Sequence, residues 1–264
     1  MNNKVEKIGF EFEFLCKNEE FIDIKKYIRS KNSKIKLGNY KFKIKKDYSV
    51  CRPYVYAPYD GRKLYEEYTG YEIISPPLSR SKGELLFIDI MQYLQQYKTN
   101  STCGLHINFS TKRIDKLNPY IFVQKYDLDS ALIKWKRNKN IFCSSYKKYI
   151  NIIFNKINNS NLNLWDHYYL GIPKDILFES AKEVFFNYVM NGGSKCRKIP
   201  FLRNAIYEFD NHGSKYHSAN LRSIKKRGYM EVRVFGNKNY PFLIKETLLE
   251  INKIFNAIHA ATAS

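Results

Sequence analysis

The segment KIGFEFEFLCK, residues 7–17, constrains the fold of this chain more than any other stretch. Three phenylalanines alternate along it with two glutamates: Phe10, Glu11, Phe12, Glu13 and Phe14. Successive side chains of a β-strand point to opposite faces, so this period of two predicts a strand over residues 8–16. One face of the strand would bury the aromatic rings. The other face would carry two carboxylates roughly 6.5–7 Å apart.

Three further stretches, YEIISPP, CGLHINFS and GYMEVRVFG, are built in the same way. Their apolar residues alternate with polar residues of a few types: Glu72, His106, Asn108, Glu231 and Arg233. Taken singly, such residues are typical of solvent-facing glutamates, a structural histidine and a cross-strand ion pair. Taken together, they predict a basin on one sheet face. Its carboxylates suit more than one Mg²⁺ ion, and its arginine suits a phosphate group.

The charge of the chain indicates an acidic partner. Lys and Arg number 45 against 25 Asp and Glu, which gives a net charge of +20. ATP, nucleic acid and an acidic protein fit this charge equally well. The segment 25–46 holds ten of the cations and no acid. It is either a solvated surface with an edge strand protected by lysines, or a surface for a phosphate polymer.

Composition excludes several classes of protein. The hydrophobic fraction of 44% and the aromatic fraction of 16% exclude wholesale disorder. The five cysteines are scattered without a C-x-x-C pair, which favours reduced thiols over a zinc site or a disulfide framework. No apolar run reaches the roughly 18 residues of a membrane helix, and the N-terminus has no signal-peptide core. We therefore expect no membrane contact and a cytoplasmic location. The chain is rich in Lys, Asn, Ile and Tyr, which is typical of a phage or a low-GC bacterium. If the source is a phage, the expected location is the cytoplasm of the host.

The remaining patterns predict one α+β domain over residues 1–264. Strand patterns also occur over 40–50, 69–80, 101–111 and the end of 215–237. Helices are expected over 20–31, 81–97 with Ser81 as the cap, 119–158, 174–190 and the C-terminal segment. The order of strand-rich, helix-rich and strand segments favours an antiparallel sheet, with a helical insertion at about 111–200.

Five blocks occur in an order that resembles the amidoligase family: GFEFEF, DYS, GYEIISPPL, CGLHINFS and KYHSANL…RGYMEVRVFG. Members of this family are ATP-dependent carboxylate–amine ligases with a glutamine synthetase-like fold. The resemblance implies a curved antiparallel sheet with helices on its convex face and the active site on its concave face. There, two or three Mg²⁺ or Mn²⁺ ions would hold ATP. A carboxylate would attack the γ-phosphate, and an amine would then displace phosphate from the acyl phosphate.

The resemblance also implies roles for individual residues. The implied metal ligands are Glu11, Glu13, Glu72, His106 and Glu231. The implied contacts with the nucleotide and its phosphates are His106, Asn108, Lys215, Asn220 and Arg222. Arg233 would steady the transferring phosphoryl group, and Asp47 and Ser49 would form a turn beside the substrate pocket. The chain has no Walker A or G-x-G-x-x-G motif, so the nucleotide is not held by a P-loop or a Rossmann turn.

Two other functions compete with an amidoligase. A metal-dependent nuclease would also use carboxylate pairs and a large positive charge. A basic nucleic-acid-binding protein without chemistry would explain the charge alone, but it gives no reason to gather carboxylates where anions bind. For the ligase, the partners would be ATP and an amino compound, a peptide or a protein side chain, beside a possible polyanion.

Overall fold

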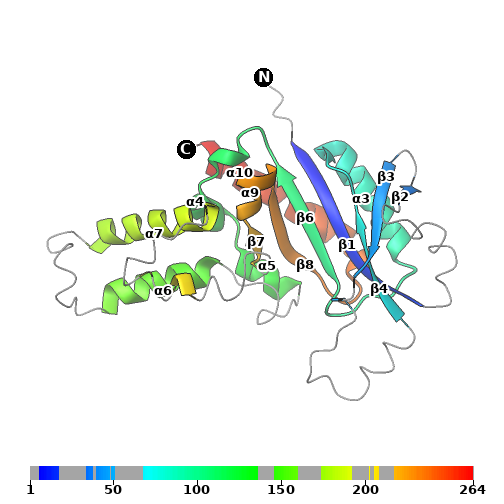
Figure 1. The fold of residues 1–264 in the computed structure, drawn as a ribbon, viewed down its shortest axis with the longest axis horizontal. Coiled ribbons are helices and arrows are strands. Elements are labelled where there is room, and N and C mark those ends of the chain that lie inside the picture. The colour runs from blue at the N-terminus through cyan, green and yellow to red at the C-terminus, as the bar shows by residue number, and fades with distance from the viewer. Residues whose placement is uncertain are drawn as a thin grey trace, which may run out of the picture.

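The computed structural model describes residues 6–17, 34–37, 40–47, 49–50, 68–135, 146–159, 174–191, 202, 205–207 and 217–263. These residues form an α+β fold around one antiparallel sheet (Figure 1). Across the sheet, the strands are β2 (Lys34–Leu37), β3 (Tyr40–Lys46), β4 (Tyr68–Ile74), β1 (Lys7–Lys17), β6 (Gly104–Ser110), β8 (Met230–Gly236) and β7 (Ala219–Asn220). The short strand β5 (Leu78–Ser79) pairs with the start of β1. The α+β class and the antiparallel sheet are thus confirmed.

Two helices cover the phenylalanine face of the sheet. The Phe87 ring of α3 (Arg80–Leu94) lies 5.1 Å from the Phe10 ring, measured between centroids. The Phe255 ring of α10 (Ile244–Ala263) lies 5.1 Å from the Phe109 ring. All four side chains are buried. Large aromatic side chains dominate the energetics of a core. The face that the sequence predicts to be apolar therefore forms the main hydrophobic core with α3 and α10.

The chain between β6 and β7 is helical in the parts that the structure describes. Its helices are η1 (Ile114–Lys116), α4 (Pro119–Lys125), α5 (Leu128–Lys134), α6 (Tyr146–Asn159) and α7 (Lys174–Asn191). Figure 1 shows α6 and α7 extending away from the sheet. The mainly helical segment predicted over 119–158 is interrupted at 126–127. There the Asp127 carboxylate accepts hydrogen bonds from the backbone N–H groups of Asp129 and Ser130, and so caps α5. Among the described helices, none is long and apolar enough to cross a membrane.

Two predicted boundaries differ from those of the structure, and one predicted helix lies outside the described residues. The prediction of Ser81 as a cap was wrong, because α3 starts at Arg80 and its N-cap is Ser79, whose side chain makes no capping hydrogen bond. The strand expected over 40–50 ends at Lys46, where the chain enters a turn. The helix expected over 20–31 lies outside the described residues.

Replacing Gly83 by alanine should destabilise the protein. A Cβ atom at Gly83 would lie 2.1 Å from Cγ2 of Ile8, where α3 crosses β1. Such overpacking costs about 1–3 kcal/mol of unfolding free energy, more than alanine gains over glycine in a helix. Chemical denaturation would measure the loss. In an Ile8→Ala background the same change should cause no loss and should show the helical gain of alanine over glycine. An equal loss in both backgrounds would contradict this contact as the cause.

Candidate metal and phosphate site

The predicted polar residues lie on the sheet face opposite α3 and α10. Residues paired across antiparallel strands point to the same face. Lys45 of β3 pairs with Glu72 of β4, which pairs with Glu13 of β1. In the next row, Glu11 of β1 pairs with His106 of β6. Strand pairing therefore brings together side chains that are far apart in the sequence.

A third row completes this face. Asn108 of β6 pairs with Glu231 of β8, which pairs with Asn220 of β7. The side chain of Asn108 donates a hydrogen bond to Oε1 of Glu11 at 3.3 Å, and that of Asn220 donates to Oε2 of Glu231 at 3.2 Å. The two amides thus orient two carboxylates that stand in different rows.

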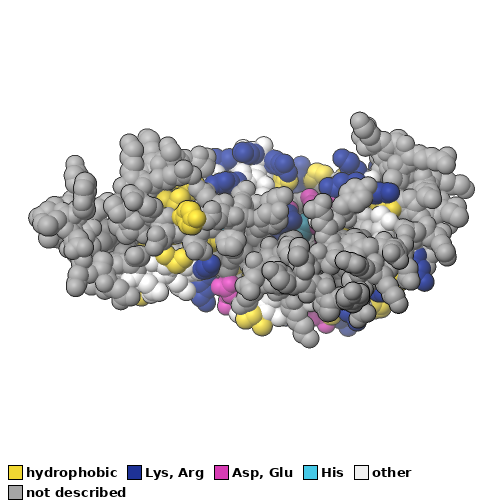
Figure 2. Space-filling view, turned by 60° about the horizontal axis from the view of Figure 1, so that its bottom comes forward, with side chains coloured by type: hydrophobic (Ala, Val, Ile, Leu, Met, Phe, Trp, Pro, Cys, Tyr) yellow, Lys and Arg dark blue, Asp and Glu magenta, His cyan; other side chains and the backbone are white. Residues whose placement is uncertain are grey.

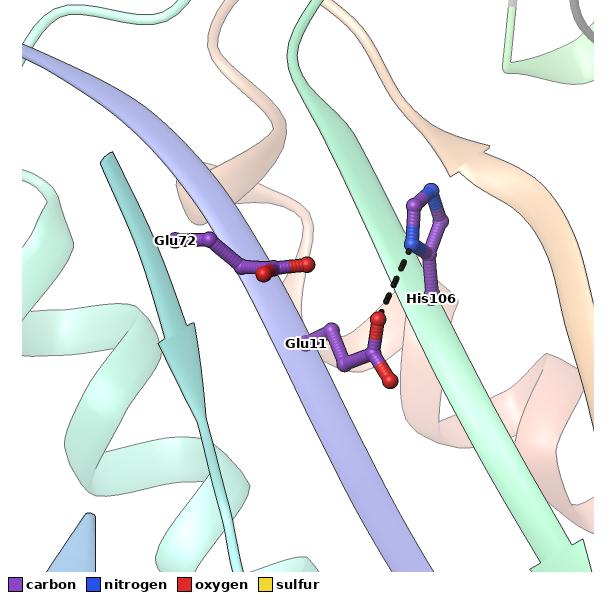
Figure 3. A group of neighbouring side chains, drawn as sticks. All are labelled: Glu11, Glu72 and His106. Carbon is purple, nitrogen blue, oxygen red and sulfur yellow. Dashed lines mark hydrogen bonds and ion pairs between the residues drawn. The ribbon is translucent and has the colours of Figure 1, made fainter. Parts of the chain in front are cut away.

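Glu11, Glu72 and His106 form a compact group of possible metal ligands (Figure 3). One ligand atom from each of the three lies within 4.8 Å of the others. Oε2 of Glu11 lies 3.5 Å from Nδ1 of His106, and Figure 3 shows the Glu72 carboxylate reaching across β1 towards them. Two carboxylates and an imidazole at this spacing suit a divalent cation.

A second group shares Glu72 with the first. Glu13, Asp47 and Glu72 also place one oxygen each within 4.8 Å of one another. Asp47 follows β3, and its Oδ1 accepts hydrogen bonds from the backbone N–H of Ser49 at 2.9 Å and from its hydroxyl at 2.6 Å. Asp47 and Ser49, which the resemblance places in a turn beside the substrate pocket, are thus hydrogen-bonded to each other. Asp47 is in addition a candidate metal ligand.

Burial and neighbouring groups shift the pKa values of both glutamates in the first ligand group. Burial raises the pKa of the Glu72 carboxyl to about 7, and the neighbouring Glu11 carboxylate adds to this rise, although Lys45 opposes it with an ion pair of 2.5 Å. Burial also acts to raise the pKa of Glu11, but the hydrogen bond and charge of His106 outweigh it and lower that pKa to about 2. Ionised Glu72 is therefore costly in this buried position, and a bound cation would stabilise its charged form.

Glu231 and Arg233 lie beside the first group. Nδ1 of His106 is 3.9 Å from Oε1 of Glu231, and the Arg233 guanidinium pairs with the same Glu231 oxygen. The register of β6 and β8 shifts opposite His106, because Leu105 pairs with Phe235 whereas Ile107 pairs with Val232. Two residues of β8, Arg233 and Val234, therefore stand opposite His106, as in a β-bulge. Bulges re-aim side chains and are frequent next to active sites. Glu231 belongs to neither three-residue group, so it is a peripheral ligand candidate.

Two buried side-chain oxygens on this face lack a hydrogen-bond donor among the described residues and are therefore available to coordinate a cation. Oδ1 of Asn108 and Oδ1 of Asn220 are buried and accept no hydrogen bond from the residues that the structure describes. Both asparagines are register partners of Glu231. A buried polar atom without a partner costs free energy, and amide oxygens are common ligands of hard cations.

Cations border this carboxylate face. A cavity of about 520 Å³ extends from Lys45 on β3 to α9 (Arg222–Arg227), and Glu11 and Glu231 contribute to its lining. The other cations that line it are Arg222, Lys226, Arg227 and Arg233. In Figure 2, a histidine and an acidic side chain are visible between dark blue Lys and Arg side chains. Carboxylates at the base of a cationic border can bind a metal ion together with a phosphate chain.

The structure brings together most of the residues that the sequence singled out. Lys215 lies outside the described residues. The sequence does not indicate that Lys45, Lys226 and Arg227 border the site. Its patterns assign Lys45 only to a general basic surface. The alternation of lysines with Phe42 and Ile44 signals that Lys45 faces away from the core. Nothing in the local sequence indicates which carboxylate it meets.

Comparisons with protein-family models, with curated proteins and with solved structures gave no match.

Proposed function

We propose that this protein is an ATP- and Mg²⁺-dependent carboxylate–amine ligase with a glutamine synthetase-like fold. It joins the two substrates through an amide or isopeptide bond. The observation that carries the proposal is the convergence of Glu11, Glu13, Glu72 and His106 from three adjacent strands. Glu11 also lines a cavity together with several lysines and arginines. The order of the five sequence blocks adds to it.

The residues fit divalent metal ions. Glu72 is common to both ligand groups, and its pKa is raised mainly by burial and further by the Glu11 carboxylate. Two asparagine oxygens beside Glu231 on the same face lack donors among the described residues. Glu11, Glu72 and His106 would hold one ion, and Glu13, Asp47 and Glu72 a second. Bound there, Mg²⁺ would neutralise charge on the phosphates and orient them.

The protein's own cations would position the nucleotide for phosphoryl transfer. Arg233 presents a guanidinium next to Glu231, and Arg222, Lys226 and Arg227 line the same cavity from α9. These cations would bind the triphosphate and stabilise the charge that develops on the transferred group. A carboxylate oxygen of one substrate attacks the γ-phosphorus and ADP leaves. The amine then attacks the acyl carbon, phosphate leaves, and the nitrogen loses a proton to form the amide.

Isothermal titration with a non-hydrolysable ATP analogue tests this proposal. Binding is expected in Mg²⁺ and is expected to weaken by about 100-fold or more in EDTA, because the phosphates would then meet bare carboxylates. Glu13→Gln should reproduce the loss in the presence of Mg²⁺. Mass spectrometry of the protein with ATP and pooled amines and acids would then search for a condensation product. Equal binding with Mg²⁺ and with EDTA would contradict a metal-held nucleotide, and ATP-independent cleavage of nucleic acid would favour a nuclease.

A further inference from the structure

A row of lysines lies on the same face as the carboxylates, towards the outer part of the sheet. Lys41, Lys43 and Lys45 of β3 are exposed and alternate with the buried side chains of Phe42 and Ile44. Alternate residues of a strand repeat about every 6.5–7 Å, so three ammonium groups follow one another along β3. We call these three residues the β3 lysine row.

Strand pairing fixes the position of the β3 lysine row relative to the candidate site. Lys43 pairs with Ile74 of β4, and Ile74 pairs with Glu11 of β1. Neighbouring strands lie about 4.7–4.9 Å apart, so the backbone of Lys43 is about 10 Å from that of Glu11. The apolar Ile74 separates the lysine from the carboxylate. A chain bound along β3 would thus run past the carboxylates without lying on them.

Two of the three charges in the row have no partner among the described residues. Lys45 pairs with Glu72, whereas Lys41 and Lys43 form no ion pair with any residue that the structure describes. Two adjacent ammonium groups without counter-ions repel one another, and they attract an anion whose charges are spaced along an extended chain.

We propose that the β3 lysine row docks an extended acidic polypeptide segment, and that this segment supplies the carboxylate which the ligase activates. The inference rests on the proposed function. Alternate residues of an extended acidic segment repeat at the same distance as the row, so their carboxylates meet successive lysines. A chain held there can place the next carboxylate in the cavity that begins at Lys45.

The row itself favours a polypeptide over a nucleic acid. Single-stranded nucleic acids bind to surfaces that combine cations with aromatic side chains on which bases stack. On β3 between Lys41 and Lys45, the aromatic and apolar residues Phe42 and Ile44 are directed into the core, and the lysines stand between them. Lysine also presents a compact charge and not the flat fork with which arginine recognises phosphate. A carboxylate is in addition the group that the proposed reaction consumes.

Fluorescence anisotropy with a labelled oligo-glutamate peptide tests the docking surface. The full chain is titrated in Mg²⁺ and the ATP analogue at low salt. The Lys41→Gln/Lys43→Gln variant should bind the peptide about ten-fold more weakly, a loss of the size that two exposed ion pairs give. The matched control is Lys82→Gln/Lys245→Gln, which removes the same charge from exposed positions on α3 and α10, across the sheet. Its affinity should change less than about two-fold.

Three results would overturn the proposal. Equal losses in the two double variants would show attraction by net charge alone. Tighter binding of oligothymidylate, with the same dependence on Lys41 and Lys43, would assign the row to nucleic acid. Lysine-dependent peptide binding in a protein that binds no Mg-ATP would leave a docking surface without the proposed substrate role, which separates failure of the ligase from failure of the surface.

Discussion

Replacing Glu72 by glutamine is expected to abolish Mg²⁺-dependent nucleotide binding while leaving the protein at least as stable above neutral pH. Glu72 is the one residue shared by both groups of candidate ligands found among the described residues. Its loss would therefore weaken two ion positions at once, and we expect metal affinity to fall by about 100-fold or more. Titration with Mg²⁺ and the ATP analogue measures this.

The expected stability follows from the raised pKa of Glu72. A carboxyl whose pKa is about 7 when folded and 4.5 when unfolded holds its proton more tightly in the native state. Stability therefore falls as pH rises from about 4.5 to about 7, and the loss persists at higher pH. Glutamine cannot ionise, so the variant should lack this fall. Above pH 7 it should gain roughly 1–3 kcal/mol, a figure that already includes the loss of the Lys45 ion pair because that pair contributes to the pKa of Glu72.

Glu250→Gln is the matched control for Glu72. Glu250 is also a buried glutamate, on α10, and its partners are Lys134 and Lys253. Burial acts to raise its pKa, but hydrogen bonds from the two lysines outweigh this and lower it. Its contribution to stability is present above the unfolded pKa and is lost as pH falls through the lower, folded pKa.

The two glutamine variants should therefore behave in opposite ways. Glu250→Gln should lose stability at neutral pH and keep Mg²⁺-dependent binding, because it is remote from the carboxylate face. Denaturant unfolding against pH and nucleotide titration compare them directly. Full metal-dependent binding in Glu72→Gln would refute the placement of the ions, whatever its stability.

Replacing Gly104 by alanine is expected to weaken metal binding by about 10–100-fold at a modest cost in stability. A Cβ atom at Gly104 would lie 2.7 Å from Nε2 of His106 and 3.0 Å from Oε2 of Glu13. Both contacts are with the ends of side chains, which can move aside without unfolding the sheet. The Gly104 backbone N–H also donates to Oε2 of Glu13 at 2.5 Å. The added methyl group would therefore displace two candidate ligands.

Gly9→Ala provides the comparison for Gly104→Ala. Gly9 is on β1, where it pairs with Asn108, and a Cβ atom there would meet its nearest neighbours at 3.8 Å, an ordinary contact. We expect Gly9→Ala to keep metal binding within about two-fold, because no candidate ligand has to move. Titration of both variants with Mn²⁺, followed by electron paramagnetic resonance, reports binding without requiring catalysis. Equal losses in the two variants would show that alanine acts through general strain of the sheet.

Much of the architecture follows from local sequence. The period of two in KIGFEFEF assigns Phe10, Phe12 and Phe14 to the core and Glu11 and Glu13 to the opposite face, and the structure places them so. The C-terminal helix is also confirmed. These predictions succeed because the alternation of side chains along a strand, and the helical period, are properties of the backbone itself.

Which residues belong to the site depends on strand pairing, and local sequence patterns do not specify strand pairing. Alternation tells which face of a strand a residue occupies, but it does not tell which strand lies next to it. Pairing of β1 with both β4 and β6 puts Glu72 and His106 on either side of Glu11 and Glu13, and pairing of β3 with β4 gives Glu72 its lysine. Asp47 joins the carboxylates because its strand ends there.

The sequence alone thus determined the two faces of the strands and the chemical types available on the polar face. Only the tertiary structure decided their neighbours, the register shift opposite His106 and the close approach at Gly104. The physical reason is that strand order is selected by burial of the whole aromatic face against α3 and α10, a non-local free energy to which every strand contributes. The carboxylates on the opposite face are brought together by that choice, at the expense of burying Glu72.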